Sequence, residues 1–542
     1  MAHHYGVLIL NTGQTYGRLK NKLLYKCVPE DKSLPRVVLV PYHDRDKQQF
    51  SKDRINKYIT FTFNDNPVSG TIRSVLGDVN KKEDYLLYRL QSQQLATTSL
   101  KSITEALKPC GFIYPSSYLF QGLQDRSKLE IYSIDPGGCQ DIDDAIGLRD
   151  YSVESMDGMV TVYIANVPLL LDRLNLWPTL SERTSTIYLP GDQKIPMLPP
   201  LLSENWCSLK AQHERLAFAM DVLILKGRII NVEVNPAVIK VEKNCAYDDL
   251  VVPDMIEDLL QITIKLNETY PFVNNDLASL KKEDQMHKLV EYWMIFMNVE
   301  CAKLLVQKEM GIFRQGAPLG APPPPPQGAP PPHPQQRAPP PHPQETLQGA
   351  KPILPSAYQH LYNVHSSPNY FLWTKSGGKG AEPPAEPPGG KGATPPGGKG
   401  ASPPTYVHIT SPIRRLVDLL NMTFLQEDII SEKGKAVAEQ WLTKIDYINQ
   451  QSKATRKIQN EALLLSLYEK DNQKVYEGCV MEREDSTCDL IKYSVYIADL
   501  KLWSSFKSRQ AGIVAGTLNQ FTLFIFMDEV KLTRKIRLQL VL

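Results

Sequence analysis

Short apolar runs separated by turn residues dominate the first part of the chain. The runs GVLIL, RVVLVPY, YITFTF, GTIRSV and DYLLYRL are rich in β-branched and aromatic side chains, and Gly, Asn and Pro fall between them. Runs of this length and composition are typical of strands. We predict a small barrel or sandwich of five strands over residues 1–95, followed by a connector with weak helical character over 96–125.

The pattern becomes mixed between residues 126 and 313. The runs MVTVYIANV and LAFAMDVLIL predict strands, and apolar residues then recur at helical spacing from Glu283 to Gly311. This spacing predicts a long helix with Gly311 at its C-cap. Its apolar face, which we expect to pack in the core, carries Leu289, Trp293, Phe296, Met297, Cys301 and Leu304.

Two low-complexity inserts interrupt the next region. Residues 315–345 are rich in proline. Residues 376–404 carry an imperfect repeat with the units GGKGAEPP, GGKGATPP and GGKGASPP. Neither composition can form a packed core. We interpret both as loops extruded from one domain over residues 126–470, and a PxxP motif in the first can recruit an SH3-like partner.

Helical spacing returns over residues 405–470, and short strand-like runs follow to the C-terminus. We predict a second small barrel over residues 471–542. The expected fold class is therefore α+β, with a mixed central domain flanked by two small β-barrels.

Composition adds limits on partners and compartment. The net charge is only +2, so a nucleic-acid site must be a local basic channel. The eight cysteines are scattered without a C-x-x-C pair, which favours reduced thiols inside the cell over a disulfide framework or a structural zinc site. No signal peptide and no apolar run long enough for a membrane span are recognisable. We expect a soluble intracellular monomer that does not bind membranes, in the cytoplasm rather than the nucleus.

The candidate chemistry lies in the stretch SIDPGGCQDIDDAI. Asp135, Asp141, Asp143 and Asp144 surround a Pro-Gly-Gly turn there. Carboxylates packed this closely repel one another unless a cation lies between them, and hard oxygen ligands favour Mg²⁺ or Mn²⁺ over zinc. A solvated acidic loop or a calcium loop remains open on chemistry alone, although the spacing excludes an EF-hand.

This stretch resembles the signature of the ribonuclease II/R family, the RNB exoribonucleases, and is most similar to their eukaryotic exosome-type branch. Two further motifs follow in the family's order: YLPGDQKIPMLPPLLSENWCSL from Tyr188 and YVHITSPIRR from Tyr406. Residues 290–292 resemble the family's V-E-E block. The barrel over 1–95 resembles its cold-shock-like domain, and the barrel over 471–542 its S1-type domain; both are OB-type barrels.

The resemblance implies a site for single-stranded RNA at the bottom of a narrow channel. Asp135, Asp141, Asp143 and Asp144 then hold Mg²⁺, with Mn²⁺ as the alternative, and Asp143 is the carboxylate most directly needed for cleavage. Arg414 grips the scissile phosphate. The implied RNA-binding residues are Tyr188, which stacks on the terminal base, Glu291, Arg414 and Arg415.

Basic residues of the two barrels are candidate contacts for RNA phosphates. These are Lys20, Lys22, Lys26, Arg36, Lys531, Arg534, Lys535 and Arg537.

The chain departs from the family pattern in three places. A second aromatic for the base clamp cannot be placed between Tyr247 and Glu283, and the GGKGA repeat replaces the family segment before TSPIRR. We also expect no docking to an exosome-type assembly, because neither an earlier cold-shock-like domain nor an endonuclease domain is recognisable.

Three functions compete at this point. The leading one is metal-dependent 3′→5′ degradation of single-stranded RNA to nucleoside 5′-monophosphates. The second is a catalytically inactive RNB-fold protein that binds and regulates RNA, against which the intact carboxylate set and Arg414 speak. A proline-rich scaffold would explain the inserts and none of the motifs.

Overall fold

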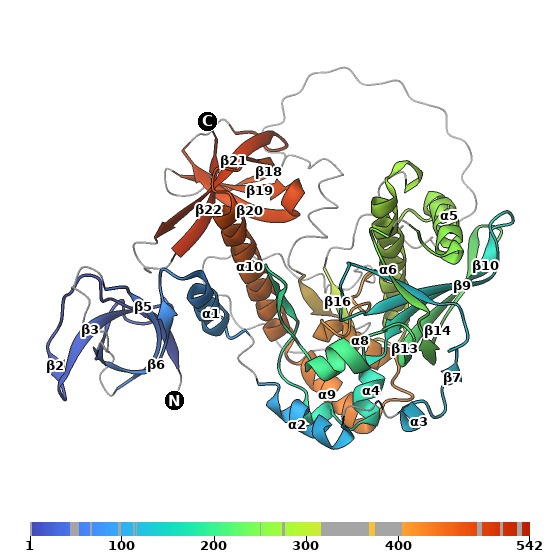
Figure 1. Ribbon diagram of the computed structural model, residues 1–542, viewed down its shortest axis with the longest axis horizontal. Helices are drawn as coiled ribbons and strands as arrows, with labels where there is room; N and C mark the ends of the chain where they lie inside the picture. Colours follow the sequence, from blue (N-terminus) through green and yellow to red (C-terminus); the bar gives the residue numbers. More distant parts are fainter. Residues whose placement is uncertain are drawn as a thin grey trace.

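The computed structural model describes residues 3–43, 54–64, 68–95, 99–111, 114, 116–249, 251–273, 277–315, 368–373, 404–484, 490–509, 513–527 and 534–541. Most of both low-complexity inserts, and with them the predicted SH3-binding motif, lies outside these residues. The architecture is α+β, as predicted. Figure 1 shows the N-terminal sheet at one end of the molecule, the central sheet at the other, and the long helix α10 running from the central body to the C-terminal sheet.

The N-terminal sheet has the strand order β2-β3-β1-β5-β6, and β4 pairs with β3. A bridge between Leu39 and Ser69 brings β4 back towards β6, so that the sheet curls into a barrel. The strands are β1 (His4–Leu8), β2 (Arg18–Leu19), β3 (Lys22–Pro29), β4 (Val38–Tyr42), β5 (Lys57–Phe63) and β6 (Gly70–Asp78).

One of the five strands predicted for this region is wrong, and two strands, the short β2 and the longer β3, were missed. The run DYLLYRL belongs to the helix α1 (Lys82–Ser92), because its residues Tyr85, Leu86, Tyr88 and Leu90 are buried at helical spacing. In β3, burial alternates around Tyr25 and Cys27.

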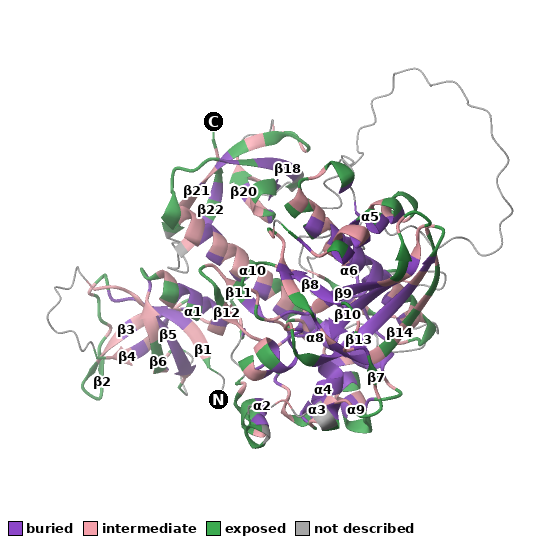
Figure 2. Ribbon diagram, turned by 45° about the vertical axis from the view of Figure 1, so that its right-hand side comes forward, coloured by how far each residue is buried: buried purple, intermediate pink, exposed green. Residues whose placement is uncertain are grey.

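The central sheet has seven strands in the order β15-β8-β9-β10-β13-β14-β7. Figure 2 shows that the middle of this sheet, β10 and β13, is mostly buried, whereas much of β14 and the outer end of β9 are exposed. The strands are β7 (Gln124–Asp125), β8 (Tyr132–Asp135), β9 (Asp144–Ser152), β10 (Asp157–Ala165), β13 (Glu214–Leu225), β14 (Arg228–Lys240) and β15 (Lys243–Ala246). Two short pairs, β11 (Ile187–Leu189) with β12 (Gln193–Ile195) and β16 (Ile312–Arg314) with β17 (Tyr370–Leu372), lie apart from it.

Helices cover the central sheet and complete its core. The predicted long helix is α6 (Lys282–Gln307), and its expected apolar face is buried except at Leu304, which is half-buried. Gly311 is not its C-cap, because Glu309 takes the left-handed conformation after Lys308 and Gly311 only precedes β16. The other helices are α2 (Lys101–Leu107), α3 (Ser116–Leu119), α4 (Val167–Arg173), α5 (Asp254–Thr269), α8 (Leu416–Leu425), α9 (Glu432–Leu442) and α10 (Ile445–Lys470).

The C-terminal sheet packs on α10 with the strand order β20-β19-β18-β21-β22. Its strands are β18 (Tyr476–Glu484), β19 (Ile491–Ile497), β20 (Leu502–Ser508), β21 (Leu518–Met527) and β22 (Arg534–Leu540). One apolar cluster, the shared core, joins this sheet to α10, α1 and the N-terminal barrel through buried residues such as Leu465, Tyr88 and Tyr58. Among the described residues, no helix is long and apolar enough to cross a lipid bilayer.

Candidate active site

The carboxylate loop connects two neighbouring strands of the central sheet. Strand β8 ends at Asp135 and β9 begins at Asp144, so both ends of the loop are fixed by the sheet. The turn between them closes with a hydrogen bond from the Cys139 amide to the Pro136 carbonyl at 3.1 Å, and Gly138 has φ +79°. Glycine adopts that conformation without strain.

The second motif holds the loop in place. The Ser208 hydroxyl accepts a hydrogen bond from the Ile142 amide at 3.1 Å and donates one to the Gln140 carbonyl at 2.8 Å. The Leu209 amide donates to the Ile142 carbonyl at 3.0 Å. Ile142 is buried in the core between Asp141 and Asp143 and therefore anchors this part of the loop.

Asp143 and Arg414 form the centre of the site although they are far apart in the sequence. One Asp143 oxygen accepts from the Ile413 amide at 2.9 Å, and the other accepts from Arg414 Nε at 3.1 Å. Arg414 also donates through Nη2 to the Ser411 hydroxyl at 3.0 Å. Burial raises the pKa of Asp143 to about 7, against the opposing effects of Arg414 and the Ile413 amide.

Asp141 is engaged by two side chains of the first hairpin pair. Tyr188 donates its hydroxyl to Asp141 Oδ2 at 2.7 Å, and Lys194 Nζ lies 3.0 Å from Asp141 Oδ1. Lys194 also forms an ion pair with Glu204 at 2.9 Å. Burial favours the neutral form of Asp141, but these hydrogen bonds outweigh it and lower its pKa.

Asp135 and Asp144, at the two ends of the loop, complete the cluster. Burial raises the pKa of Asp135 to about 6, and Asp141 adds to that rise. Burial, together with the nearby charges of Asp135 and Asp143, raises the pKa of Asp144 well above its ordinary value. The buried Oδ2 atom of Asp135 has no hydrogen-bond partner within the described part of the chain.

This donor set fits a hard divalent cation in its chemistry. The four carboxylates are all oxygen ligands, and Asp135 leaves a buried oxygen unsatisfied. Burial first, and repulsion between the carboxylates second, raise the pKa values of Asp135 and Asp144. As they stand, however, no three His, Cys, Asp or Glu side chains of the described residues are grouped for metal binding. Lys194 and Arg414 supply positive charge to Asp141 and Asp143 in this arrangement.

The remaining predicted site residues are not part of the cluster. Arg415 turns to Asp418, with Nη2 2.8 Å from Oδ1, and Asp418 in turn accepts from the Ser411 amide. Glu291 lies on α6, where it pairs with Lys288 at 2.6 Å.

Two residues of the site were missed at the sequence level. Lys194 lies inside a recognised motif, but nothing in the sequence pairs it with Asp141. Tyr247 stacks on His287 with ring centroids 3.7 Å apart, and burial with the charges of Asp144 and Asp135 raises the pKa of its hydroxyl. An aromatic side chain therefore lies beside the cluster in the region where none could be placed.

The basic residues predicted to contact phosphates are spread over both barrels. Lys20, Lys22 and Arg36 are exposed, Lys26 is half-buried against the Tyr16 ring, and Lys531 lies outside the described residues. Lys535 and Arg537 line a hollow with Arg89 and Lys457 of α1 and α10.

Comparison with known proteins bears on this arrangement. Residues 123–258 match the model of the RNB domain. The exosome complex exonuclease RRP44 of Mus musculus is 29% identical over 205 residues, which are 37% of this chain and 21% of that protein. The chain thus spans about a fifth of the length of that relative in the match.

Solved structures extend the likeness to nearly the whole chain. Mycoplasma genitalium RNase R in complex with ribose-methylated single-stranded RNA has a TM-score of 0.61 and 16% identity, covering 99% of this chain and 89% of that one. Yeast Ssd1, a pseudonuclease, has a TM-score of 0.56 and 12% identity, covering 96% and 66%. At these identities the likeness shows a shared fold. The resemblance found in the motifs is confirmed: residues 123–258 match the RNB domain, and the chain is similar in sequence to RNase R and to exosome exonucleases.

Proposed function

We propose that this chain is a hydrolytic exoribonuclease that degrades single-stranded RNA from its 3′ end and releases nucleoside 5′-monophosphates. The observation that carries the proposal is the contact of Arg414 with Asp143. It joins the carboxylate loop to a motif more than two hundred residues away, and Tyr188 of a third motif reaches the same loop. Three separate segments supply a cation-binding group, a phosphate-binding group and an aromatic ring at one place.

Each residue has a role that follows from its chemistry. Asp135, Asp141, Asp143 and Asp144 would hold a divalent cation, Mg²⁺ or Mn²⁺. Such an ion lowers the pKa of a bound water and stabilises charge on the phosphodiester. Arg414 presents a planar guanidinium to a phosphate and offsets the charge that develops when the bond from phosphorus to O3′ breaks.

Tyr188 is placed to stack on a base, because its side chain is partly exposed at 39% while its hydroxyl is anchored on Asp141. Stacking on an aromatic ring does not depend on base identity, so the enzyme would degrade RNA without sequence preference. Tyr247 and Glu291 would border the path of the terminal nucleotide on the side of α6.

The test is a cleavage assay on 5′-labelled single-stranded RNA with Mg²⁺ or Mn²⁺. We expect a descending ladder of products that disappears with EDTA and in Asp143→Asn, and an RNA with a blocked 3′ end should resist. Asp143→Asn keeps the shape of the side chain, so RNA binding measured in parallel separates lost chemistry from lost folding. Intact RNA that is nevertheless tightly bound by the wild type would overturn the proposal.

A second candidate function is RNA binding without catalysis. Lys194 and Arg414 already neutralise two of the carboxylates, and no metal-holding group is formed by the described residues. A pseudonuclease shares the fold. The same assay decides between the two, because this candidate predicts binding with no products at any concentration of Mg²⁺ or Mn²⁺.

A further inference from the structure

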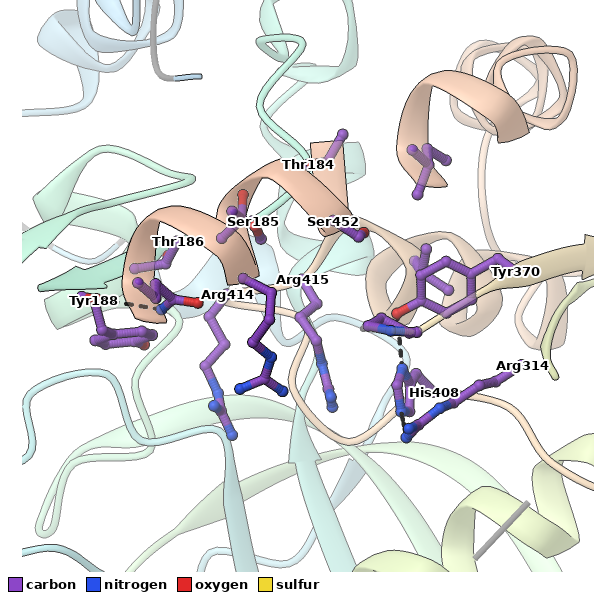
Figure 3. A pocket seen from close by; sticks show the side chains of 16 residues that line it. Thr184, Ser185, Thr186, Tyr188, Arg314, Tyr370, His408, Arg414, Arg415 and Ser452 are labelled. Atoms are coloured by element: carbon purple, nitrogen blue, oxygen red, sulfur yellow. Dashed lines mark hydrogen bonds between the residues drawn. The ribbon is translucent and has the colours of Figure 1, made fainter. Parts of the chain in front are cut away.

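A cavity of about 260 Å³ adjoins the carboxylate cluster at Arg414. Its walls come from the segment before Tyr188, from α10, from the pair β16–β17 and from the segment around Arg414. Figure 3 shows Tyr188 and Arg414 at one end of it, with Tyr370, His408 and Arg314 at the other. We call this cavity the arginine pocket, because four arginines line it: Arg314, Arg414, Arg415 and Arg456.

Positive charge in the arginine pocket is not balanced from within. None of the described residues that line it is Asp or Glu. Asp143 and Asp418 offset Arg414 and Arg415 from behind, and Arg456 has no carboxylate within salt-bridge distance among the described residues. Burial and the charge of Arg314 lower the pKa of Arg456, and burial and the charge of Arg415 lower that of Arg314. Mutually repelling, partly desolvated cations are stabilised by an anion between them.

Hydrogen-bond donors in the pocket wall are also unsatisfied. The Nε atom of Arg415 and the hydroxyl of Thr455 are buried and have no hydrogen-bond partner in the described part of the chain. Thr455 is only 7% exposed, so bulk water does not replace that partner. Buried donors left without acceptors are costly and uncommon in native proteins.

The histidine in the wall is neutral and adds no acceptor. Arginine can only donate, so the contact of Arg314 Nη1 with His408 Nε2 at 3.1 Å makes Nε2 the acceptor. His408 Nδ1–H then donates to the Tyr370 hydroxyl at 2.8 Å, which leaves the tyrosine proton available to another acceptor. Burial and the charges of Arg415, Arg314 and Arg414 keep the pKa of His408 well below its ordinary value.

We propose that the arginine pocket is a second phosphate site, in which Arg314, Arg415, Arg456 and the Thr455 hydroxyl bind the oxyanion of a nucleotide next to the phosphate gripped by Arg414. A phosphate group is acceptor-rich and anionic, which complements a wall of donors with excess positive charge. The phosphate comes either from the RNA backbone or from a free nucleoside monophosphate. The backbone source rests on the proposed RNA substrate, whereas the free-nucleotide source does not.

The first arm measures binding of inorganic phosphate and of AMP to the full chain by calorimetry, in EDTA so that no cleavage is involved. We expect the wild type to bind and Arg456→Gln to bind about tenfold more weakly, since one charge-assisted hydrogen bond is worth roughly that factor. Lys453→Gln is the matched control, because it removes the same charge from an exposed position of α10 outside the pocket. Thr455→Val should weaken binding by a smaller factor, and Arg456→Lys should recover part of the loss.

The second arm uses single-stranded RNA, also in EDTA, that carries one neutral methylphosphonate linkage at successive positions from the 3′ end. A backbone source predicts one position at which the neutral linkage weakens wild-type binding about tenfold but leaves Arg456→Gln unaffected. If instead AMP or phosphate binds through Arg456 and no linkage shows this dependence, the source is the free nucleotide.

Folding is checked in the same samples by thermal unfolding. Without added anion, Arg456→Gln should unfold at the wild-type temperature or above it, because it removes a cation that Arg314 repels. A wild type that shows neither anion binding nor a sensitive linkage, or variants that match Lys453→Gln in both arms, would overturn the site. Neither result depends on cleavage, so loss of the nuclease proposal would leave this test intact.

Discussion

The two sides of Arg414 balance their charge in opposite ways. On one side four aspartates gather within a single loop, and a lysine and an arginine reach in to offset them. On the other side four arginines line a cavity, none of whose described lining residues is acidic, and aspartates outside the cavity offset only Arg414 and Arg415. A negative site beside a positive one, joined by a shared guanidinium, suits a substrate that must contact a metal cation and present phosphates at the same time. Substitutions of Arg414 itself should affect both sites, whereas substitutions on one side should affect that site alone.

The shared residue should give the largest effect. Arg414→Lys keeps the charge but loses the planar fork that reaches Asp143 and a phosphate together. We expect kcat for RNA cleavage to fall about 100- to 1,000-fold, with RNA affinity changed only a few-fold. Arg415→Lys, on the neighbouring residue paired with Asp418, should mainly raise KM. Equal changes in kcat for both variants would contradict a special role for Arg414.

Protonation should weaken the acidic side alone. The pKa values of Asp143, about 7, and Asp135, about 6, lie above the ordinary value, so protons compete with a cation as the pH falls. Between pH 8 and pH 6 the ionised fractions fall to about one tenth and about one half, which predicts a loss of Mg²⁺ affinity of about tenfold to twentyfold.

A magnesium titration of cleavage rate at each pH measures this loss. Asp143→Asn, followed through Mn²⁺ binding, should lose the larger part of the dependence. Affinity that stays constant from pH 6 to pH 8 would show that these carboxylates do not titrate in that range.

Removal of the lysine should strengthen cation binding at the same side. Lys194→Met removes the positive neighbour of Asp141 Oδ1, and we expect Mn²⁺ affinity to rise about fivefold, the upper range for a partly exposed ion pair. Glu204→Gln should have the opposite sign, because it releases Lys194 to Asp141 alone. Electron paramagnetic resonance of bound Mn²⁺ reports both, and changes of the same sign would contradict the competition.

The smallest effect should come from the loop backbone. Gly138→Ala forces a left-handed conformation on alanine, which costs about 1 kcal/mol, although its added methyl group would meet no atom within 4 Å. Cleavage should fall only a few-fold. Gly137→Ala is the matched control, because that position has neither a positive φ nor a neighbour within 4 Å. Equal activity of the two variants would show that the turn is not needed in this shape.

The sequence predicted those parts of the site that are local or carried by a motif. Asp135 to Asp144 fall in one short run, and Tyr188 and Arg414 lie in recognised blocks, so their likeness to a known family could be seen directly. Lys194 and Tyr247 could not be found in this way. Their contacts to Asp141 and to the His287 ring depend on the path of the chain through the sheet and α6, and no local pattern encodes that path.

The fold shows the same limit. The helix α6 could be predicted, because many apolar residues recur along it at helical spacing. The run DYLLYRL was wrongly predicted as a strand, since tyrosine and leucine suit both structures and only packing of α1 against α10 and the barrel decides between them. The end of α6 was mispredicted for a similar reason. Glu309, and not Gly311, takes the left-handed conformation there, and a non-glycine residue in that conformation cannot be recognised from the sequence.

The shared core limits which parts of this protein could be removed, by proteolysis or by gene recombination, without exposing apolar side chains. Tyr58 of the first barrel, Tyr88 of α1, Leu465 of α10 and Phe521 of the last sheet bury one another in a single cluster. Arg89 of α1 reinforces it by pairing with Glu30 at 3.0 Å and Glu461 at 3.4 Å. Exposing such side chains costs about 1.5–3 kcal/mol each, a large part of the stability of one domain. The two barrels and α10 therefore form one inseparable unit, and a recombination event or a protease that removed either barrel would strip the other of its packing partner.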